Sequence, residues 1–273
     1  MRELSLREIQ LGELQILKRL DEICKENGFK YFLAYGTLIG AVRHKGFIPW
    51  DDDVDVAMPR EDYNRLIQYC IAHAEEMKPI VLKHWSVDKN YIYPIARLCD
   101  TRYKIEYKDA VDYELGLFVD IYPYDGCGNS MQDARKIFKE LGKARACAVV
   151  AGNNHFIFSK TSFWRNLIKY PMYLYAKMRG AGYFVKKVDL MAQERADDTD
   201  RLIYCTIWGF DINWAIPREV FDEALFVEFE GCRFPAPVRY DEWLTVTYND
   251  YMQLPPESDR IAHHYYKAYK KDE

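Results

Sequence analysis

Four aspartates within five residues stand directly before an apolar run, and they are Asp51, Asp52, Asp53 and Asp55. Carboxylates this close repel one another, so the fold has to supply a cation or hydrogen-bond donors. Apolar segments at residues 31–35 and 54–58 lie on either side of the cluster, which predicts two buried strands next to it. We therefore expect a sheet that presents carboxylates to a cation.

A small-residue turn and a basic loop lie between these two segments. Gly36 and Thr37 leave the first strand and open a short apolar helix near Leu38, whose exposed amides suit a phosphate group. The loop that follows carries the basic residues Arg43, His44 and Lys45. The turn alone is a weak signal, but its combination with the acids that follow is a strong one.

Side chains alternate between the two faces of a strand, so we expect Asp51, Asp53 and Asp55 on one face and Asp52 on the other. Oxygen ligands on one face suit Mg²⁺ or Mn²⁺, which takes its remaining ligands from substrate phosphates and water. Two alternatives are less consistent with the sequence. A calcium loop requires glycine where Val56 stands, and a solvated acidic turn does not explain the apolar flanks.

A single carboxylate, Asp120, interrupts the apolar strand that is predicted over residues 117–122. A buried unpaired charge is costly, so this side chain should face a cation or a hydrogen-bonding cluster. Together with Asp53 and Asp55 it would complete a site for two metal ions about 3.5–4 Å apart. The alternative is a structural carboxylate that is satisfied by hydrogen bonds.

Composition narrows the class of protein. The chain has 273 residues, 49% of them hydrophobic, which is enough for one large domain or one domain with an insertion. A net charge of -4 argues against a general nucleic-acid binder. The odd number of cysteines, the lack of a CxxC pair and the lack of an apolar leader predict reduced thiols in a cytoplasmic protein. No apolar run is long enough for a membrane span, so we expect a soluble or peripheral protein.

The apolar periodicity predicts an α+β fold in which helices cover a sheet of roughly five or six strands. The first helix begins with a capping box at Ser5 and Glu8 and ends near Gly28. Further helices are predicted over residues 59–74, 132–150, 163–178, 183–198 and 240–248. Strands are predicted over 30–35, 54–58, 79–83, 91–98, 103–107, 117–122, 203–208 and 225–229, with a loop at 234–237 and a polar tail.

The helical middle of the chain is basic and rich in aromatic residues. Residues 141–188 contain no Asp or Glu, while nine Lys and Arg side chains alternate with Phe, Trp and Tyr. Such a region suits an anionic membrane surface or a polyanionic acceptor. The alternative is helices that pack on the sheet and expose a basic, solvated face, which is the usual explanation of a run of charges.

The segment YGTLIGAVRHKGFIPWDDDVDVAMPREDY resembles the signature of the LicD family of phosphocholine and related phosphotransferases, which also includes fukutin-related ribitol-phosphate transferases. Three later segments resemble further blocks of this family: YPIARLCD, GLFVDIYPYDG and FPAPVRYDEWLTVTYNDYMQLPPESDRIAHH. The similarity covers both ends of the chain and leaves the basic middle as the variable part.

The resemblance implies a nucleotidyltransferase-like mixed β-sheet with flanking helices and a helical insertion. Residues 1–129 and 200–273 would form this catalytic core, and residues 130–199 would form the insertion. The implied activity is transfer of a phospho-alcohol group from a CDP-linked donor, most plausibly CDP-choline, with release of CMP. The acceptor would be a hydroxyl of a cell-surface glycan, such as a teichoic acid, a lipopolysaccharide precursor or another lipid-linked glycan.

The resemblance also implies roles for individual residues. Asp53 and Asp55 match the metal-binding acids, and Asp51 matches the first acid of the family pattern. Asp120 matches a third carboxylate that accepts the proton of the attacking hydroxyl or holds the metal ion. The residues implied to contact substrate are Gly36, Thr37, Arg43, Lys45, Arg97, His263 and His264.

Some of these roles have alternatives. Arg97 would neutralise charge on the transferred phosphoryl group, or it would form a surface ion pair. His263 and His264 match the family ending, but packing or capping also explains them. For the whole chain, the alternatives are a true nucleotidyltransferase acting on a sugar or small molecule, and a non-catalytic protein that binds glycans or membranes.

Overall fold

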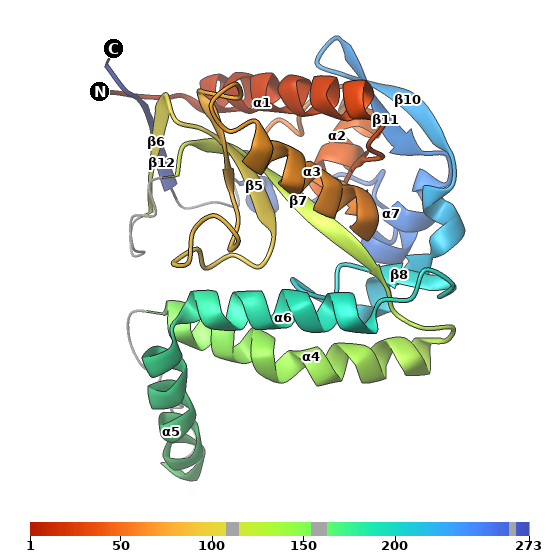
Figure 1. The fold of residues 1–273 in the computed structure, drawn as a ribbon. Helices are drawn as coiled ribbons and strands as arrows, with labels where there is room; N and C mark the ends of the chain where they lie inside the picture. The colour runs from red at the N-terminus through yellow and green to blue at the C-terminus, as the bar shows by residue number, and fades with distance from the viewer. Residues whose placement is uncertain (108–114, 154–162, 262–265, 273) are drawn as a thin grey trace.

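The computed structural model describes residues 1–107, 115–153, 163–261 and 266–272. Helices and strands are mixed along the chain, and the described strands form three separate sheets (Figure 1). The predicted α+β class is confirmed at this level.

The main sheet positions the acidic cluster. Its strands lie in the spatial order β2 (Phe32–Leu33), β3 (Asp55–Pro59), β7 (Leu117–Gly126), β5 (Ala96–Asp100) and β4 (Ile80–Lys83). β3 and β7 run parallel, whereas the other neighbours are antiparallel, so the sheet is mixed. The short strands β8 (Leu202–Tyr204) and β9 (Ile216–Pro217) extend it from the end of β7.

β7 is the central strand of this sheet, and all of its residues are buried. α1 (Leu6–Asn27), α3 (Arg60–Ala72) and α6 (Ala181–Arg195) pack against it (Figure 1). A strand that is covered on both faces reads as an almost continuous apolar run. This is why a carboxylate at Asp120 is conspicuous in the sequence.

The first helix confirms the signals at its two ends. Ser5 accepts a hydrogen bond from the backbone N–H of Glu8, and the Glu8 carboxylate accepts one from the backbone N–H of Ser5. Gly28 ends the helix in the left-handed conformation, with φ of 65°. Between these ends, a buried stripe that includes Ile16 and Leu20 seats α1 on the sheet.

Three helices that follow β7 form a separate layer (Figure 1). α4 (Met131–Gly152) and α6 lie side by side, and α5 (Phe163–Arg179) projects from their end. Their bounds lie close to the predicted ones. Within the described parts of the chain, we find no helix with the length and apolar character that crossing a bilayer requires.

Two smaller sheets correct the sequence predictions. β6 (Tyr103–Tyr107) is not in the main sheet but pairs with β12 (Tyr266–Lys270), which pairs in turn with β1 (Arg2–Glu3). The prediction of a polar tail is therefore wrong over β12, where Ala268 is buried between exposed Lys267 and half-buried Tyr269. The loop predicted at 234–237 is also wrong, because these residues belong to β11.

β10 (Ala224–Phe229) and β11 (Cys232–Pro237) form a two-stranded ribbon, which tolerates the prolines of β11 because the strand has a free edge.

α2 (Tyr35–His44) begins three residues before the expected start at Leu38. α7 (Tyr240–Tyr248) has the predicted bounds. The 3₁₀ turns are η1 (Ile212–Trp214), η2 (Arg218–Phe221) and η3 (Glu257–Asp259). All seven cysteines are free thiols, and six of them are buried.

Candidate active site

A cavity of about 700 Å³ opens where β3, β5 and β7 meet the start of α2. Its acidic wall consists of Asp51, Asp53, Asp55 and Asp120. Asp52 does not line it, although residues 51–54 precede β3 and are not part of the strand in which alternation was expected. The rest of the wall is largely aromatic and includes Trp50, Tyr93, Tyr122, Trp208, Trp214 and Tyr248.

The parallel pairing of β3 with β7 brings two of the acids together. Asp55 is the direct partner of Asp120 in this register, and the backbone N–H of Asp120 donates to the carbonyl of Val54 at 2.9 Å. Both side chains are buried. The main-chain hydrogen bonds between the two strands therefore bring Asp55 and Asp120 together, although they are far apart in sequence. A shared site of these two acids requires this.

Gly36 and Thr37 lie in the first turn of α2 rather than in a turn before it. A Cβ atom on Gly36 would stand 2.6 Å from Oδ2 of Asp51, so glycine is needed for the carboxylate to approach the helix. The Oγ1 atom of Thr37 accepts a hydrogen bond from the backbone N–H of Asp55 at 2.8 Å. Gly36 thus lines the cavity, whereas Thr37 is buried and fixes the start of β3.

Asp55 carries an uncompensated buried atom. Its Oδ1 has no hydrogen-bond partner among the described residues. Burial raises the pKa of Asp55 well above its usual value, the neighbours Asp53, Asp120 and Asp51 raise it further, and a hydrogen bond with Tyr122 partly opposes this. An oxygen in this position is poised to bind a cation.

Glu13 is a member of this acidic group that the sequence analysis missed. It lies on the buried face of α1 with an exposed fraction of 0%, and neither carboxylate oxygen has a hydrogen-bond partner among the described residues. Burial raises the pKa of Glu13 well above its usual value, and Asp53, Asp52 and Asp51 add to the shift. The signal was present, because Glu13 interrupts the apolar stripe of α1 as Asp120 interrupts β7.

Arg97 is buried, so it does not form the surface ion pair that was the alternative for it. Its Nε and Nη2 donate to Oδ1 and Oδ2 of Asp120 at 2.5 and 3.0 Å, and both side chains are buried. The guanidinium lies between the rings of Tyr93 and Phe118, 3.9 and 4.0 Å from their centroids. The third nitrogen, Nη1, is buried without a hydrogen-bond partner among the described residues. Asp120 thus faces a hydrogen-bonding cluster, one of the two outcomes expected for it.

The chemistry of this cavity suits a divalent cation, but the predicted set of three ligands is not assembled. Within the described ranges, no group of three or more His, Cys, Asp or Glu side chains is arranged to hold a metal ion. The reason is that Arg97 engages both oxygens of Asp120. The free Oδ1 of Asp55, with Asp53 beside it in the cavity, is the part of the predicted set that fits a metal ion.

The side chains of the basic loop lie in two separate places. Arg43 lines an adjoining cavity of about 460 Å³, where its Nη1 donates to the carbonyl of Tyr251 at 2.6 Å. Lys45 is exposed and lies 3.7 Å from Glu228, so the structure does not bring it to the acidic cavity. His263 and His264 lie outside the described residues.

The aromatic wall contains rings from distant parts of the chain. Tyr122 of β7 and Trp208 of the loop after β8 contact each other edge to face, with centroids 6.3 Å apart. Trp208 also contacts Phe210 at 5.9 Å. Several rings around carboxylates form a surface that binds organic cations well. Trp50 and Tyr122 lie next to the acids in sequence, whereas Tyr93, Trp208, Trp214 and Tyr248 are brought to the cavity by the fold.

A protein family and individual proteins are similar to this chain. Residues 28–143 match the family described as LicD/FKTN/FKRP, nucleotidyltransferase domain. The chain is 33% identical over 297 residues to the lipopolysaccharide cholinephosphotransferase LicD of Haemophilus influenzae, which covers 98% of this chain and 99% of that protein. An uncharacterized protein of Rickettsia prowazekii is 46% identical over 58 residues, which is 21% of this chain and 22% of that protein.

Proposed function

Because this chain belongs to the LicD family and is an enzyme of the LicD type, we propose that it transfers phosphocholine from a CDP-linked donor to a hydroxyl of lipopolysaccharide or a related cell-surface glycan. The observation that carries this proposal is the similarity over almost the whole chain to a lipopolysaccharide cholinephosphotransferase. The cavity supports it, because carboxylates and aromatic rings converge there.

In the proposed reaction, the acceptor oxygen attacks the phosphorus atom that bears choline. The bond between this phosphorus and the bridging oxygen breaks, and CMP leaves with that oxygen. The proton of the acceptor hydroxyl passes to a carboxylate of the cavity. Such transfers depend mainly on positioning and on electrostatic stabilisation of the phosphoryl group.

We assign Mg²⁺ or Mn²⁺ as the cofactor, held by Asp53 and Asp55. The unpartnered Oδ1 of Asp55 supports this assignment, as does the mutual repulsion of the acids. When bound, the ion would neutralise charge on the donor phosphates. We propose that Asp120 acts by orienting Arg97. It holds two nitrogens of the guanidinium and leaves Nη1 for a phosphate oxygen of the donor.

The aromatic wall suits the choline group. A quaternary ammonium binds to the faces of aromatic rings, and nearby carboxylates add to the attraction. Tyr122, Trp208 and Tyr248 line the same cavity as Asp55. Ribitol or glycerol would instead need many hydrogen-bonding partners, which this wall offers less well.

We further propose that the mixed sheet is a nucleotidyltransferase-like core made by residues 1–129 and 200–273, into which residues 130–199 are inserted. The family match over residues 28–143 supports the first part of this core and extends into the beginning of α4. The layer formed by α4, α5 and α6 supports the insertion, since it follows β7 and precedes the return to β8.

An assay of products tests the proposed reaction. The purified chain is incubated with Mg²⁺, a lipopolysaccharide acceptor, and CDP-choline, CDP-ribitol, CDP-glycerol or a nucleoside triphosphate in parallel. We expect CMP from CDP-choline, lost at least a hundredfold in Asp53→Asn and retained in Asp222→Asn, an exposed aspartate outside the cavity. Pyrophosphate from a triphosphate would favour a nucleotidyltransferase instead, and no turnover of any donor would refute the proposal.

We also propose that α5 contacts an anionic membrane surface. Tyr170, Leu174 and Met178 form a stripe along one side of α5, with exposed fractions of 46%, 50% and 80%. Lys169, Lys177 and Arg179 accompany them, and no acid occurs between 141 and 188. Exposed apolar residues beside basic ones favour the interface of an anionic bilayer.

Flotation with liposomes tests this contact. We expect recovery with anionic liposomes to exceed recovery with neutral ones, and to fall severalfold in Leu174→Glu. The matched control Leu11→Glu changes an exposed leucine of α1, with an exposed fraction of 42%, and should float as the parent does. Equal recovery with both kinds of liposome would rule the contact out.

A further inference from the structure

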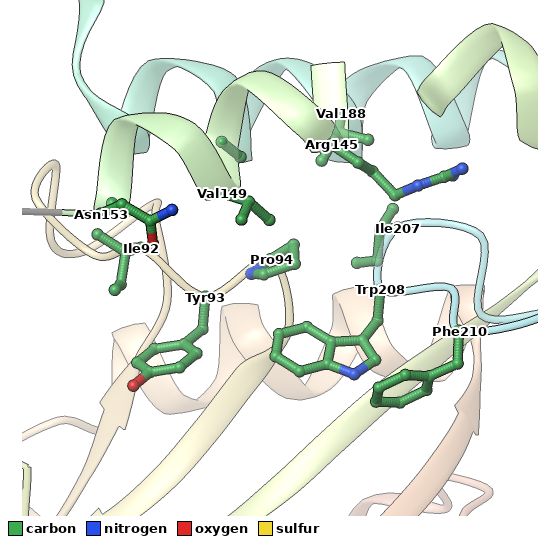
Figure 2. A pocket seen from close by; sticks show the side chains of 12 residues that line it. Ile92, Tyr93, Pro94, Arg145, Val149, Asn153, Val188, Ile207, Trp208 and Phe210 are labelled. Carbon is green, nitrogen blue, oxygen red and sulfur yellow. The ribbon is translucent and has the colours of Figure 1, made fainter. Parts of the chain in front are cut away.

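A second cavity, of about 450 Å³, lies against α4 beside the acidic cavity (Figure 2). This volume lies within the range of small-molecule sites in proteins, about 300–1,000 Å³. One wall is the face of α4 that carries Val149, and the opposite wall is the loop that carries Pro94. Among the described residues that line it there is no acidic side chain.

The two cavities share an aromatic wall. Tyr93, Trp208 and Phe210 line both of them. Tyr93 stacks on Trp208 with centroids 6.4 Å apart, and Figure 2 shows the three rings along one side of the second cavity. A molecule in the second cavity would therefore lie next to the reacting groups, so the second cavity is placed to hold another part of a substrate.

The second cavity offers little to a polar ligand. Arg145 is the one charged residue among the described residues of the lining. It donates from Nη1 to the carbonyl of Thr206 at 2.6 Å and from Nη2 to the carbonyl of Phe138 at 2.7 Å. Its guanidinium also stacks on the Phe138 ring at 3.7 Å. The remaining lining is mainly aliphatic, with Ile92, Val188 and Ile207 as examples. Asn153 and the Nε1 atom of Trp208, which has no hydrogen-bond partner among the described residues, are further polar groups of the lining. Sugars, nucleotides and phosphates need more partners than these, whereas a hydrocarbon chain needs none.

The cavity is accessible from the side on which α5 projects. Val149 lines it and has an exposed fraction of 64%. Ala148, another lining residue, belongs to the apolar cluster that seats Ala176 of α5, and Ile92 packs against the same cluster. The face of α5 that carries Ala176 therefore packs beside the part of α4 that lines the cavity.

From this lining and this position, we propose that the second cavity binds a long hydrocarbon chain, namely the lipid part of the acceptor. This inference rests on the proposed transferase function for its biological role. The chain would occupy the space between α4 and the loop at Pro94, while the acceptor hydroxyl passes the shared aromatic wall to the acids. The site would thus select acceptors that are still attached to lipid.

Calorimetric titration with dodecyl maltoside below its critical micelle concentration tests the binding site without any turnover. Maltose serves as the control ligand, because it has the same head group without the chain. We expect saturable 1:1 binding of dodecyl maltoside and none of maltose. Absence of saturable binding, or equal binding of maltose, would overturn the proposal even if the transferase reaction were established.

Two variants locate the binding. Val149→Asp introduces a charge at the mouth, and Gly152→Leu narrows it, since a Cβ at Gly152 would stand 3.7 Å from Cδ1 of Ile92 without a clash. Each should weaken binding of dodecyl maltoside at least tenfold. The matched control is Val246→Asp, an exposed valine near the end of α7 that lines neither cavity. Unchanged affinity in both mouth variants would place the probe elsewhere and refute the assignment.

A kinetic arm distinguishes the acceptor lipid from an unrelated fatty chain. With a lipid-linked acceptor, dodecyl maltoside should raise the KM for acceptor severalfold and leave kcat unchanged. With the same glycan after removal of its lipid, it should have no effect. If both acceptors respond alike, the site binds hydrocarbon but not the acceptor, and the proposed role is wrong.

Discussion

At the scale of single residues, the pair of Arg97 and Asp120 is the feature with the sharpest consequence. Two of the three guanidinium nitrogens are held by Asp120, and the third has no partner among the described residues. A lysine keeps the charge but cannot reproduce this fork. The role of Arg97 therefore depends on its shape as well as on its charge.

We predict that Arg97→Lys lowers kcat/KM about 10²–10³-fold, the range typical of losing one preorganised donor to a transition state. The KM for donor should rise as well, since the unpartnered nitrogen is assigned to a donor phosphate. Steady-state kinetics with CDP-choline measures both. Arg102→Lys is the control, because Arg102 forms a similar fork on Asp100 outside the cavity. A folded Arg97→Lys protein with parental kinetics would contradict this role.

His84 gives a prediction for stability. Burial lowers its pKa to about 4, with Asp189 partly opposing the shift. The unfolded chain binds a proton near the ordinary value of about 6.5, so between these values the unfolded state binds more protons than the folded state. The stability that comes from keeping His84 neutral is present above pH 6.5 and is lost as the pH falls toward 4.

We predict that this histidine removes about 2 kcal/mol of folding free energy between pH 6.5 and 5. His84→Asn should abolish that share of the pH dependence, while retaining a partner for the hydroxyl of Ser86, which His84 contacts at 2.8 Å. Urea unfolding at several pH values measures it. Parallel curves for parent and His84→Asn would show that the prediction is wrong.

The residues of the site were predictable where they are acids in an apolar context. Asp51, Asp53, Asp55 and Asp120 could be grouped from the sequence because a buried charge needs a partner. The partner itself could not be identified, since the bond between Arg97 and Asp120 depends on the antiparallel register of β5 and β7. Glu13 carried the same kind of signal in α1, and it was overlooked because helix periodicity was used only to find apolar positions.

At the scale of elements, an ion-pair cluster joins the helical layer to the sheet. Arg60, the first residue of α3, donates to Asp125 of β7 at 2.6 and 2.9 Å and to Asp189 of α6 at 2.7 Å. Both carboxylates are almost fully buried. Removal of the Arg60 guanidinium would leave these two buried carboxylates without their cationic partner.

We predict that Arg60→Met lowers the free energy of unfolding by about 3–5 kcal/mol, as is usual when one partner of a buried ion pair is removed. Arg65→Met is the matched control on the same helix, where the pair with Asp62 is exposed, and it should cost about 1 kcal/mol or less. Urea unfolding of both variants decides this. Equal losses in the two variants would mean that burial of the Arg60 cluster adds nothing.

The elements themselves were predicted unevenly. The caps and periodicity of α1 placed it well from the sequence, and α7 was placed well although it has no side-chain cap. β12 was missed because its pairing partners, β6 and β1, are remote in sequence and its composition is polar. β11 was missed because prolines usually mark loops, and only its position in a two-stranded ribbon makes them acceptable.

At the scale of the whole molecule, the acids connect cation binding to folding. Asp51 and Asp53 come from the segment before β3, Asp120 from β7 and Glu13 from α1, so repulsion among them acts across the core. A ligand that binds only the folded state stabilises that state in proportion to its concentration. We therefore expect stability to depend on divalent cations.

We predict that Mn²⁺ at about 100 times its Kd raises the free energy of unfolding by about 2.7 kcal/mol. The same addition should have little effect on Asp53→Asn or on Asp55→Asn. Thermal unfolding with and without Mn²⁺ measures the difference, with Ca²⁺ and K⁺ as comparison ions. A stabilisation that persists in both variants would locate the ion elsewhere.

The parallel register of β3 and β7 determines which residues of the two strands face each other at the site. Asp55 and Asp120 are direct partners in this register. The distance between their Cα atoms is therefore set by the pairing of the two strands, and a change of side-chain rotamer does not alter it. Insertion of one residue before Asp120 in β7 would set an aliphatic side chain opposite Asp55 and turn the carboxylate to the other face. Such a chain could keep its core and lose its site, so this strand should tolerate substitutions far better than changes of length.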